Sequence, residues 1–257
     1  MRIGRQDNPY SAIATSDADS ITVRGRDLCG ELIGKVDFTS YFWLLVTGRE
    51  PDARQRALAN AVLVAIAEHG LVPSVVAARM TYAAAPEAFH GAVAAGLLGC
   101  GSVVLGSAEA AGRFLHGLVA GGQDAAEGVR ALRTERKAIP GFGHPEHSGG
   151  DPRADLLLRL AAEHGTEGPH IAMLRAVEAA IPAVIGRTLP INVNGAIPAV
   201  MLDAGFPLAA LKGISLLART AGLIGHLQEE TERPIGFILA GKAADAIGYD
   251  GPPAGGK

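Results

Sequence analysis

The sequence predicts an all-α protein, and three observations support this prediction. Apolar residues recur at spacings of three and four along most of the chain, which is the period of helices that bury one face. No alternation of strand and helix patterns is visible, which argues against a doubly wound α/β fold. Alanine and glycine are abundant and aromatic residues make up only 5% of the chain, a composition that suits closely packed helices.

Length, charge and cysteine content narrow the class of protein. The 257 residues, 48% of them hydrophobic, can form one large domain or a large and a small one. The formal net charge is −3 and no polybasic block is present, so we expect no nucleic-acid partner. Residues 1–8 lack the apolar stretch of a signal peptide, and we expect a cytoplasmic protein. Cys29 and Cys100 are expected to be buried thiols rather than a disulfide.

The elements follow from the spacing of apolar residues and from local helix signals. Residues 21–23 form a short β-like run that fits a small hairpin or an extended arm. After Gly30 the pattern indicates two short helices, the second capped near Thr39 or Ser40. Further helices are predicted over residues 53–68, 74–85, 88–104, 108–119, 125–137, 155–164 and 171–180, from about 196, and over 208–230. The tail after Gly241 is expected to be frayed at its end.

The longest uncharged run, residues 91–108, is long enough to cross a bilayer. Its glycines and serines make it weakly apolar, so we predict a closely packed buried helix, at a subunit interface or inside a monomer. We therefore expect no membrane partner.

Residues 137–153, KAIPGFGHPEHSGGDPR, are predicted to form an irregular functional loop because three prolines and several glycines exclude regular structure. His144 and His147 flank Glu146, which is compatible with a metal site. Metalloprotease histidines, however, lie four apart on a helix, and Pro145 excludes a helix at His144. The fragments GFG and GCG do not follow a parallel strand, so they do not indicate dinucleotide binding.

Five collinear segments resemble the citrate synthase superfamily. They are SITVRGRDLCGELIGKVDFTSYFWLLVTGREP at 20–51, EHGLVPS at 68–74, GFGHPEHSGGDPRA at 141–154, INVNGAIPAVMLDAGFP at 191–207 and ARTAGLIGHLQEETERP at 218–234. The similarity covers nearly the whole chain, which looks closest to the citryl-CoA lyase modules, such as the C-terminal part of ATP-citrate lyase. It implies a citrate synthase-like fold with a large helical domain (1–109 and 194–257) and a smaller one (110–193). It also implies a homodimer or a higher homo-oligomer.

The resemblance implies roles for four residues. His144 matches a histidine that hydrogen-bonds the keto or hydroxyl oxygen of the oxaloacetate part. Arg153 matches a carboxylate-binding arginine, and His69 a histidine near the same carboxylates. Arg233 resembles a basic position in the last helix region.

Three residues in or near these segments can instead have purely structural roles. His69 can be the C-terminal cap of a helix, His226 a packed core histidine, and Asp151 only the cap of the next helix.

Two departures from the family pattern bear on the reaction. The Leu-His-Gly-Gly histidine of the synthases is replaced by Val104 or Leu105, and the lyase modules also lack that histidine. The family's catalytic aspartate is Asn194 here, and an amide cannot act as a carboxylate base. Asn194 can instead donate an N–H to a developing enolate oxygen. His147, then Glu146 and Glu109, or water are left to protonate carbon.

The chemistry implied by the resemblance is a retro-Claisen cleavage. Citryl-CoA, or a related 3-hydroxy-3-carboxyacyl-CoA, would give an acyl-CoA such as acetyl-CoA and a 2-oxo acid such as oxaloacetate. The alternatives are condensation of the citrate or methylcitrate synthase type, and non-catalytic binding of CoA or a tricarboxylate. No metal and no tightly bound cofactor are expected, because the CoA thioester is substrate or product. The phosphates of CoA need cationic partners, and the candidates in the sequence are Arg24, Arg26, Arg136 and Lys137.

Overall fold

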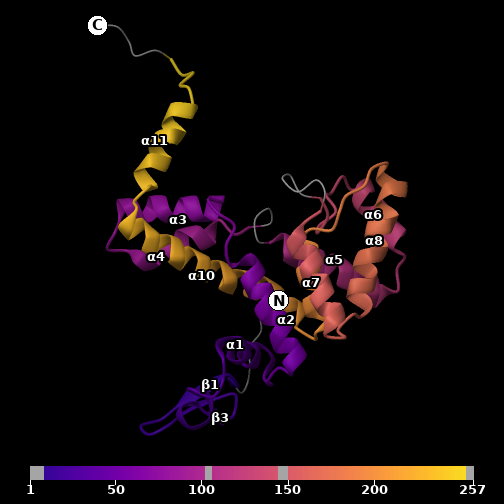
Figure 1. Cartoon of the computed structure of the whole chain (residues 1–257), viewed down its shortest axis with the longest axis horizontal. Coiled ribbons are helices and arrows are strands. Elements are labelled where there is room, and N and C mark those ends of the chain that lie inside the picture. Colours follow the sequence, from indigo (N-terminus) through magenta and orange to yellow (C-terminus); the bar gives the residue numbers. More distant parts are fainter. Residues whose placement is uncertain (1–8, 102–105, 144–149, 253–257) are drawn as a thin grey trace. The chain divides into compact units, whose positions relative to one another are not determined.

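The computed structural model describes residues 9–101, 106–143 and 150–252. It is mainly helical, as Figure 1 shows, and this confirms the all-α prediction. The chain divides into two compact units. Unit 1 comprises residues 1–62 and 111–211, and unit 2 comprises residues 63–110 and 212–257.

Unit 1 opens with a small antiparallel sheet and continues into helices. The strands pair in the order β1-β2-β3, which confirms the short strand expected at residues 21–23. The elements of unit 1 are β1 (Ala14–Ser16), β2 (Ile21–Val23), β3 (Arg26–Asp27), η1 (Leu28–Leu32), α1 (Phe38–Thr47), most of α2 (Ala53–Ala67), α5 (Ser107–Gly121), α6 (Ala125–Thr134), α7 (Pro152–Glu163), α8 (Pro169–Ile185), α9 (Val193–Asp203) and η2 (Leu208–Ala210).

Helix α9 is the central helix of unit 1. Its residues 195–201 are all buried, as expected of a helix that is apolar on every side. It packs against both α7 and α8. This packing holds the N-terminal turn of α9, which carries Asn194, within the body of unit 1.

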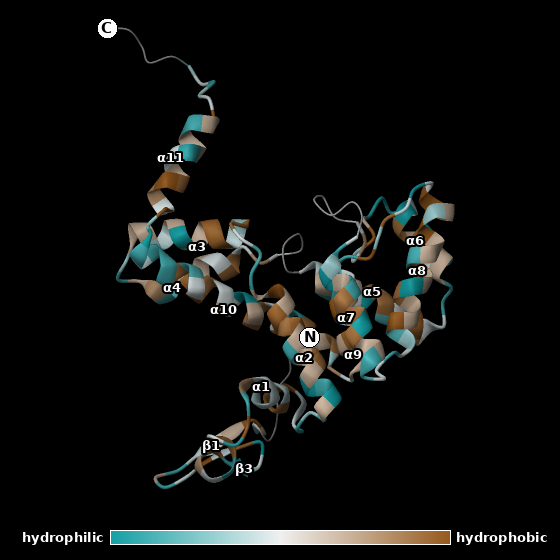
Figure 2. Ribbon diagram, viewed as in Figure 1, coloured by the Kyte–Doolittle hydropathy of each residue, from teal (hydrophilic) through white to brown (hydrophobic). Residues whose placement is uncertain are grey.

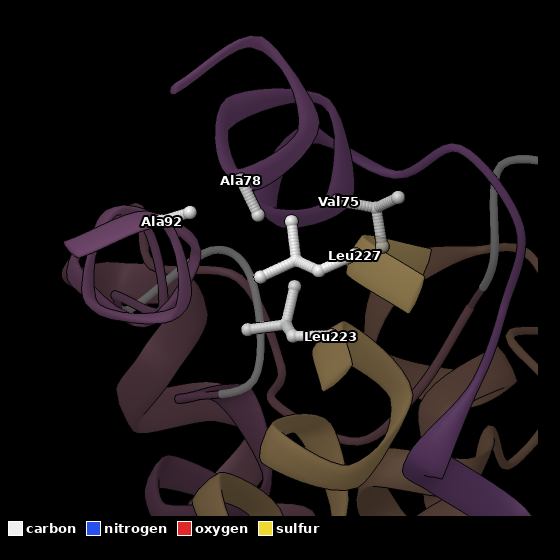
Figure 3. Close-up of a cluster of buried hydrophobic side chains, with 5 residues drawn as sticks. All are labelled: Val75, Ala78, Ala92, Leu223 and Leu227. Atoms are coloured by element: carbon white, nitrogen blue, oxygen red, sulfur yellow. The ribbon is translucent and has the colours of Figure 1, made fainter. Parts of the chain in front are cut away.

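Unit 2 is built around α10. It contains the end of α2, α3 (Pro73–Ala84), α4 (Phe89–Leu98), α10 (Leu211–Glu232) and α11 (Gly236–Ala246). Figure 3 shows its core, in which side chains of α3, α4 and α10 meet: Val75, Ala78, Ala92, Leu223 and Leu227. A β-carbon on Gly96 would lie 2.8 Å from Leu223 and from the Ser74 carbonyl oxygen, so this glycine allows α4 to approach α10 closely.

Several sequence predictions need correction. Helix α1 is capped by Asp37, whose carboxylate accepts the Ser40 amide at 2.9 Å, so the cap lies before Thr39 and Ser40. The helix expected over 88–104 ends at Leu98, where Gly99 follows, and so the run 91–108 is not one helix. Helix α11 continues past Gly241 to residue 246, and the last residues of the tail, 253–257, lie outside the described residues.

The prediction of two buried thiols is correct for Cys100 and wrong for Cys29. Both cysteines are free, and Cys100 is buried as expected, but Cys29 is exposed in η1.

The two units do not coincide with the expected domains. Unit 1 joins residues 194–211 to the expected small domain because α9 packs on α7 and α8. Compactness alone does not test the expected domain boundaries at 110 and 193, which stay a prediction.

One helical stretch, Leu208–Glu232, has the length and composition of a membrane span, with 33% of its apolar window buried. Leu223 and Leu227 in this stretch form the unit 2 core, which accounts for part of its apolar character. Figure 2 also shows apolar residues on α11.

Candidate active site

The segment that leads into His144 is fastened to the segment that leads into α9, and both lie in unit 1. The Gly143 amide donates to the Pro190 carbonyl oxygen at 2.8 Å, and the Asn192 amide donates to the Gly141 carbonyl oxygen at 3.0 Å. Asn192 Nδ2 donates to the Gly143 carbonyl oxygen at 2.6 Å. These bonds fix the main chain immediately before His144.

Two glycines bring this loop into main-chain contact with α9. A β-carbon on Gly141 would lie 2.7 Å from Gly195 Cα, and one on Gly195 would lie 2.5 Å from the Gly141 carbonyl oxygen. Gly141 also has a φ of +93°, which side-chain-bearing residues rarely adopt. Both positions therefore require glycine, and the loop cannot move along α9 without losing this contact.

Asp151 fixes the far end of the loop. Its fully buried carboxylate caps α7 by accepting the Arg153 amide at 3.1 Å and also accepts the Val193 amide of α9 at 2.9 Å. Burial tends to raise the pKa of Asp151, but the hydrogen bonds from Arg153 and Val193 outweigh it and hold that pKa below its ordinary value. Asp151 is thus the helix cap that was considered for it and, in addition, a link between α7 and α9.

Arg153 is oriented by this carboxylate. Its Nε and Nη2 donate to Asp151 Oδ1 and Oδ2 at 3.0 and 2.9 Å. A guanidinium has a second, end-on pair of N–H groups, on Nη1 and Nη2, which can still bind a carboxylate with two hydrogen bonds. The side chain is 24% exposed, so Arg153 retains access to a ligand.

Asn194 is the second residue of α9 and is half-buried. Its backbone amide donates to Oδ1 of Asn192, the cap of this helix, at 2.9 Å. The first turn of a helix carries partial positive charge, which favours a negative group beside it. An amide at this position can donate a hydrogen bond to such a group but cannot take up a proton as a base.

His144, Glu146 and His147 lie outside the described residues. Across the three described ranges, no group of three His, Cys, Asp or Glu side chains is arranged to hold a metal ion. Because the structure does not describe His144, Glu146 and His147, the roles expected for their side chains stay predictions.

A basic cavity of about 810 Å³ opens in unit 1 beside the same loop, and its wall includes Gly143. Its lining combines cationic and apolar side chains: Arg133, Arg136, Lys137 and Arg187 with Ile139, Phe142, Ile185 and Leu189. Lys137 Nζ lies 2.6 Å from Glu135, whereas the three arginines form no ion pair within the part of the chain that the structure describes. The cavity is therefore suited to an anion that also carries an apolar group.

Arg136 has an unusual backbone in this wall. Its φ of +53° lies in the left-handed region, directly after the end of α6, where glycine is the common residue. For a residue with a side chain this conformation costs about 1–2 kcal/mol. Strain of this kind is concentrated at functional positions, and here it retains a guanidinium at the cavity.

The other two candidate cations for CoA are occupied elsewhere in unit 1. Arg24 donates through Nε and Nη2 to the Leu45 carbonyl oxygen, at 3.1 and 2.5 Å. Arg26 forms ion pairs with Glu50 and Glu31. Of the four residues that the sequence left open, Arg136 and Lys137 are the two that line the cavity.

His69 lies in unit 2, in the exposed segment between α2 and α3. The preceding carboxylate holds its main chain, since Glu68 Oε1 accepts the His69 amide at 2.8 Å and the Gly70 amide at 2.6 Å.

Sequence reasoning missed Arg219 in α10. The residue is only 4% exposed, yet its Nε and Nη1 have no hydrogen-bond partner among the described residues. Ser215, one helical turn earlier, is also buried, and its hydroxyl lacks a partner within the same ranges. The nearby Cys100 does not balance the charge, because burial raises the pKa of its thiol despite the cation. Leaving two buried guanidinium nitrogens without a partner is costly, so within the described residues this site is suited to an anionic ligand.

A sequence signal for this residue existed: an arginine within the otherwise uncharged run ISLLARTAGLIG of an apolar helix. The arginine named from sequence, Arg233, lies just after α10 with an exposed side chain, and its carbonyl oxygen accepts a bond from Arg79 Nη2 at 3.0 Å. It is about 21 Å along the helix axis from Arg219, at 1.5 Å per residue. Its expected substrate-binding role stays a prediction.

Comparisons with known proteins identify the family and the fold. The family described as citrate synthase, C-terminal domain, matches residues 11–236. The structure of citryl-CoA lyase from Hydrogenobacter thermophilus has a TM-score of 0.88 at 29% identity, covering 100% of this chain and 98% of that one. ATP citrate lyase from Methanothrix soehngenii, solved with citrate and coenzyme A, has a TM-score of 0.81 at 23% identity, covering 97% of this chain and 43% of that one.

Curated relatives from Mycobacterium tuberculosis and Mycobacterium bovis, which carry the name citrate synthase 2 provisionally, are 30% identical over 187 residues. The match covers 70% of this chain, and the chain spans about half the length of these relatives, 49%.

Proposed function

Since this chain belongs to the citrate synthase family, we propose that it cleaves citryl-CoA, or a related 3-hydroxy-3-carboxyacyl-CoA, to an acyl-CoA and a 2-oxo acid. For citryl-CoA the products are acetyl-CoA and oxaloacetate. The similarity to the Hydrogenobacter lyase, which extends over the whole of both chains, supports cleavage rather than condensation.

The observation that carries the proposal is the basic cavity, which reaches the residue immediately before His144. CoA carries phosphate groups, which require cations, and an adenine ring, which requires apolar contact. Arg133, Arg136 and Arg187 can meet the phosphates, while Phe142 and its apolar neighbours can meet the ring. A CoA thioester bound there would have its acyl end free to extend toward the loop.

Two arginines, one in each unit, are each suited to bind a carboxylate group. Nε and Nη1 of the buried Arg219 lack a partner within the described ranges, so a carboxylate would satisfy these two nitrogens. Arg153 offers the end-on face of a guanidinium whose other face is fixed by Asp151. Each can form charge-assisted hydrogen bonds with a carboxylate.

In the proposed reaction, His144 takes the proton of the tertiary hydroxyl group. As the C–O bond becomes a carbonyl, the adjacent C–C bond breaks and its electron pair moves to the acyl α-carbon, giving the enolate of the acyl-CoA. The amide of Asn194 and the positive end of α9 stabilise the negative charge on the thioester oxygen. His147, or in its place Glu146, Glu109 or water, then donates a proton to the α-carbon.

The test is direct incubation with citryl-CoA, with oxaloacetate followed by NADH oxidation through malate dehydrogenase. We expect oxaloacetate release that depends on enzyme concentration and is abolished by His144→Ala. Absence of release above background, with citryl-CoA consumed in a control lyase reaction, would overturn cleavage of this substrate.

A second candidate function is favoured by one observation: Asn194 stands where the family pattern has a catalytic aspartate, so the chain can be a binder of CoA and tricarboxylates without turnover. Supplying acetyl-CoA and oxaloacetate and measuring free thiol tests condensation in the same series. Binding of CoA and citrate by calorimetry, without product in either direction, would support the non-catalytic function.

We also propose assembly into a homodimer or a higher homo-oligomer. Phe237 and Ile238 on α11 are 72% and 58% exposed, and large exposed apolar side chains of this kind often lie in interfaces. Light scattering during size-exclusion chromatography gives the mass, and a monomer at micromolar concentration would contradict the proposal.

A further inference from the structure

The main chain at His69 is held by a single carboxylate oxygen. Glu68 Oε1 accepts the amides of His69 and Gly70, at 2.8 and 2.6 Å, directly after the last turn of α2. Gly70 has a φ of +70°, so the chain turns sharply there. The direction in which the His69 side chain leaves the backbone is thus fixed by the Glu68 side chain.

Helix α10 in turn holds Glu68. His226 Nε2 lies 2.9 Å from Glu68 Oε1, within interaction distance although its alignment falls short of a hydrogen bond. One turn earlier, Gly222 has no side chain, and a β-carbon there would lie 2.1 Å from the Ala67 carbonyl oxygen and 2.9 Å from Glu68 Oε2. The end of α2 can therefore rest directly on α10.

The charges support a fixed carboxylate. Burial tends to raise the pKa of Glu68, but the contact with His226 and the two amides outweigh it, so this pKa is lowered and Glu68 is ionised at neutral pH. The second ring nitrogen of His226, Nδ1, lies 3.5 Å from Nη1 of the buried Arg79. Arg79 is itself held by Glu230 at 2.5 Å and Glu229 at 2.9 Å. An arginine can only donate, which assigns Nδ1 as the acceptor and leaves the Nε2 proton for Glu68.

Arg219, Gly222 and His226 follow one another at helical spacings of three and four, so they form one stripe on α10. We propose that Glu68 is a positioning residue, which fixes the backbone of His69 and, through His226 and Gly222, ties this substrate-binding imidazole to the helix that carries Arg219. The histidine and the arginine would then bind carboxylate groups of the substrate from the same compact unit. The substrate-binding part of this inference rests on the proposed function, whereas the contacts of Glu68 with His69, Gly70 and His226 do not.

The test compares Glu68→Ala and Glu68→Gln with Glu87→Ala, a matched acidic control in the exposed turn between α3 and α4 of the same unit. Hydrogen exchange of the His69 and Gly70 amides in the full chain measures the positioning without any substrate. We expect exchange at least about tenfold faster in Glu68→Ala, a smaller increase in Glu68→Gln, whose amide oxygen still accepts, and no change in Glu87→Ala.

Steady-state cleavage of citryl-CoA then measures the consequence. We expect KM to rise about tenfold in Glu68→Ala with a smaller change in kcat, and Glu68→Gln to recover most of the loss. Unchanged amide exchange, or equal KM values in all variants of an active enzyme, would overturn the inference. An inactive wild-type protein in which Glu68→Ala still accelerates exchange would overturn the proposed function alone. If Glu68→Ala does not fold, Glu68→Gln and His226→Gln provide the same comparison.

Discussion

Replacing Arg136 with glycine should move stability and ligand affinity in opposite directions. The left-handed backbone of Arg136 costs about 1–2 kcal/mol, and glycine avoids this cost. Glycine also gives the unfolded chain more freedom, which offsets about 0.5–1 kcal/mol of the gain. Arg136→Gly should therefore raise the free energy of unfolding by up to about 1 kcal/mol.

The same substitution removes one cation from the basic cavity. A hydrogen bond to a charged group is worth about 1.5–3 kcal/mol, and solvent screening at this exposed side chain reduces the value toward the lower end. A loss of about 1.4 kcal/mol corresponds to a tenfold weaker Kd. We therefore expect CoA to bind about tenfold more weakly, with a shallower dependence on salt concentration.

Urea denaturation measures the first effect, and calorimetric titration with CoA measures the second. Arg24→Gly is the matched control, because Arg24 also has a positive φ, of 50°, but its guanidinium bonds the Leu45 carbonyl oxygen. This control should lose stability and keep its affinity for CoA. If Arg136→Gly binds CoA as tightly as the wild type, the assignment of the cavity to CoA is wrong.

Three further predictions concern the carboxylate-binding groups and the loop. Arg219→Met should leave the Tm of the ligand-free protein unchanged or raised, because a buried cation with two unbonded nitrogens among the described residues is replaced by an apolar side chain. It should also remove the rise in Tm that we expect citrate to give the wild type, and a rise retained in the variant would contradict the assignment. Gly195→Ala should lower the free energy of unfolding by about 1–3 kcal/mol, since its β-carbon would lie 2.5 Å from the Gly141 carbonyl oxygen; an unchanged urea midpoint would show that loop and helix can separate. The pKa of Asp151 is lowered in the folded protein, so its contribution to stability is full above the unfolded value of about 3.9 and is lost as the pH falls through the folded value. The stability difference between the wild type and Asp151→Asn should accordingly shrink below about pH 4, and a difference that grows in acid would refute the argument.

The helices were predictable because apolar spacing records which face each one buries. Their ends were less predictable where a neighbouring residue offered the stronger local interaction. Asp37 caps α1 with its carboxylate, ahead of the hydroxyl groups of Thr39 and Ser40, and Gly99 follows an α4 that ends well before residue 104. The family and its chemistry were recognisable because the motifs keep their order along the chain.

The candidate site was predictable only where one short motif carries it. Asp151 and Arg153 are two residues apart, so their pairing lies within a single motif. The basic cavity joins residues 133–143 to residues 185–189, and no local pattern reports that proximity. Arg219 was missed for the same reason: whether an arginine is buried without a partner depends on the side chains around it in space.

The contact between Gly141 and Gly195 has a consequence for how this site can evolve. Neither position can accept a larger residue alone, so substitutions there are selected against and the path of both backbones is preserved. The adjoining Asn194 uses its main chain for the bond to Asn192, and its side chain is free to be exchanged without disturbing that bond. An amide and a carboxylate can therefore replace one another there across descendants, and the chemistry can diverge while the scaffold is inherited intact.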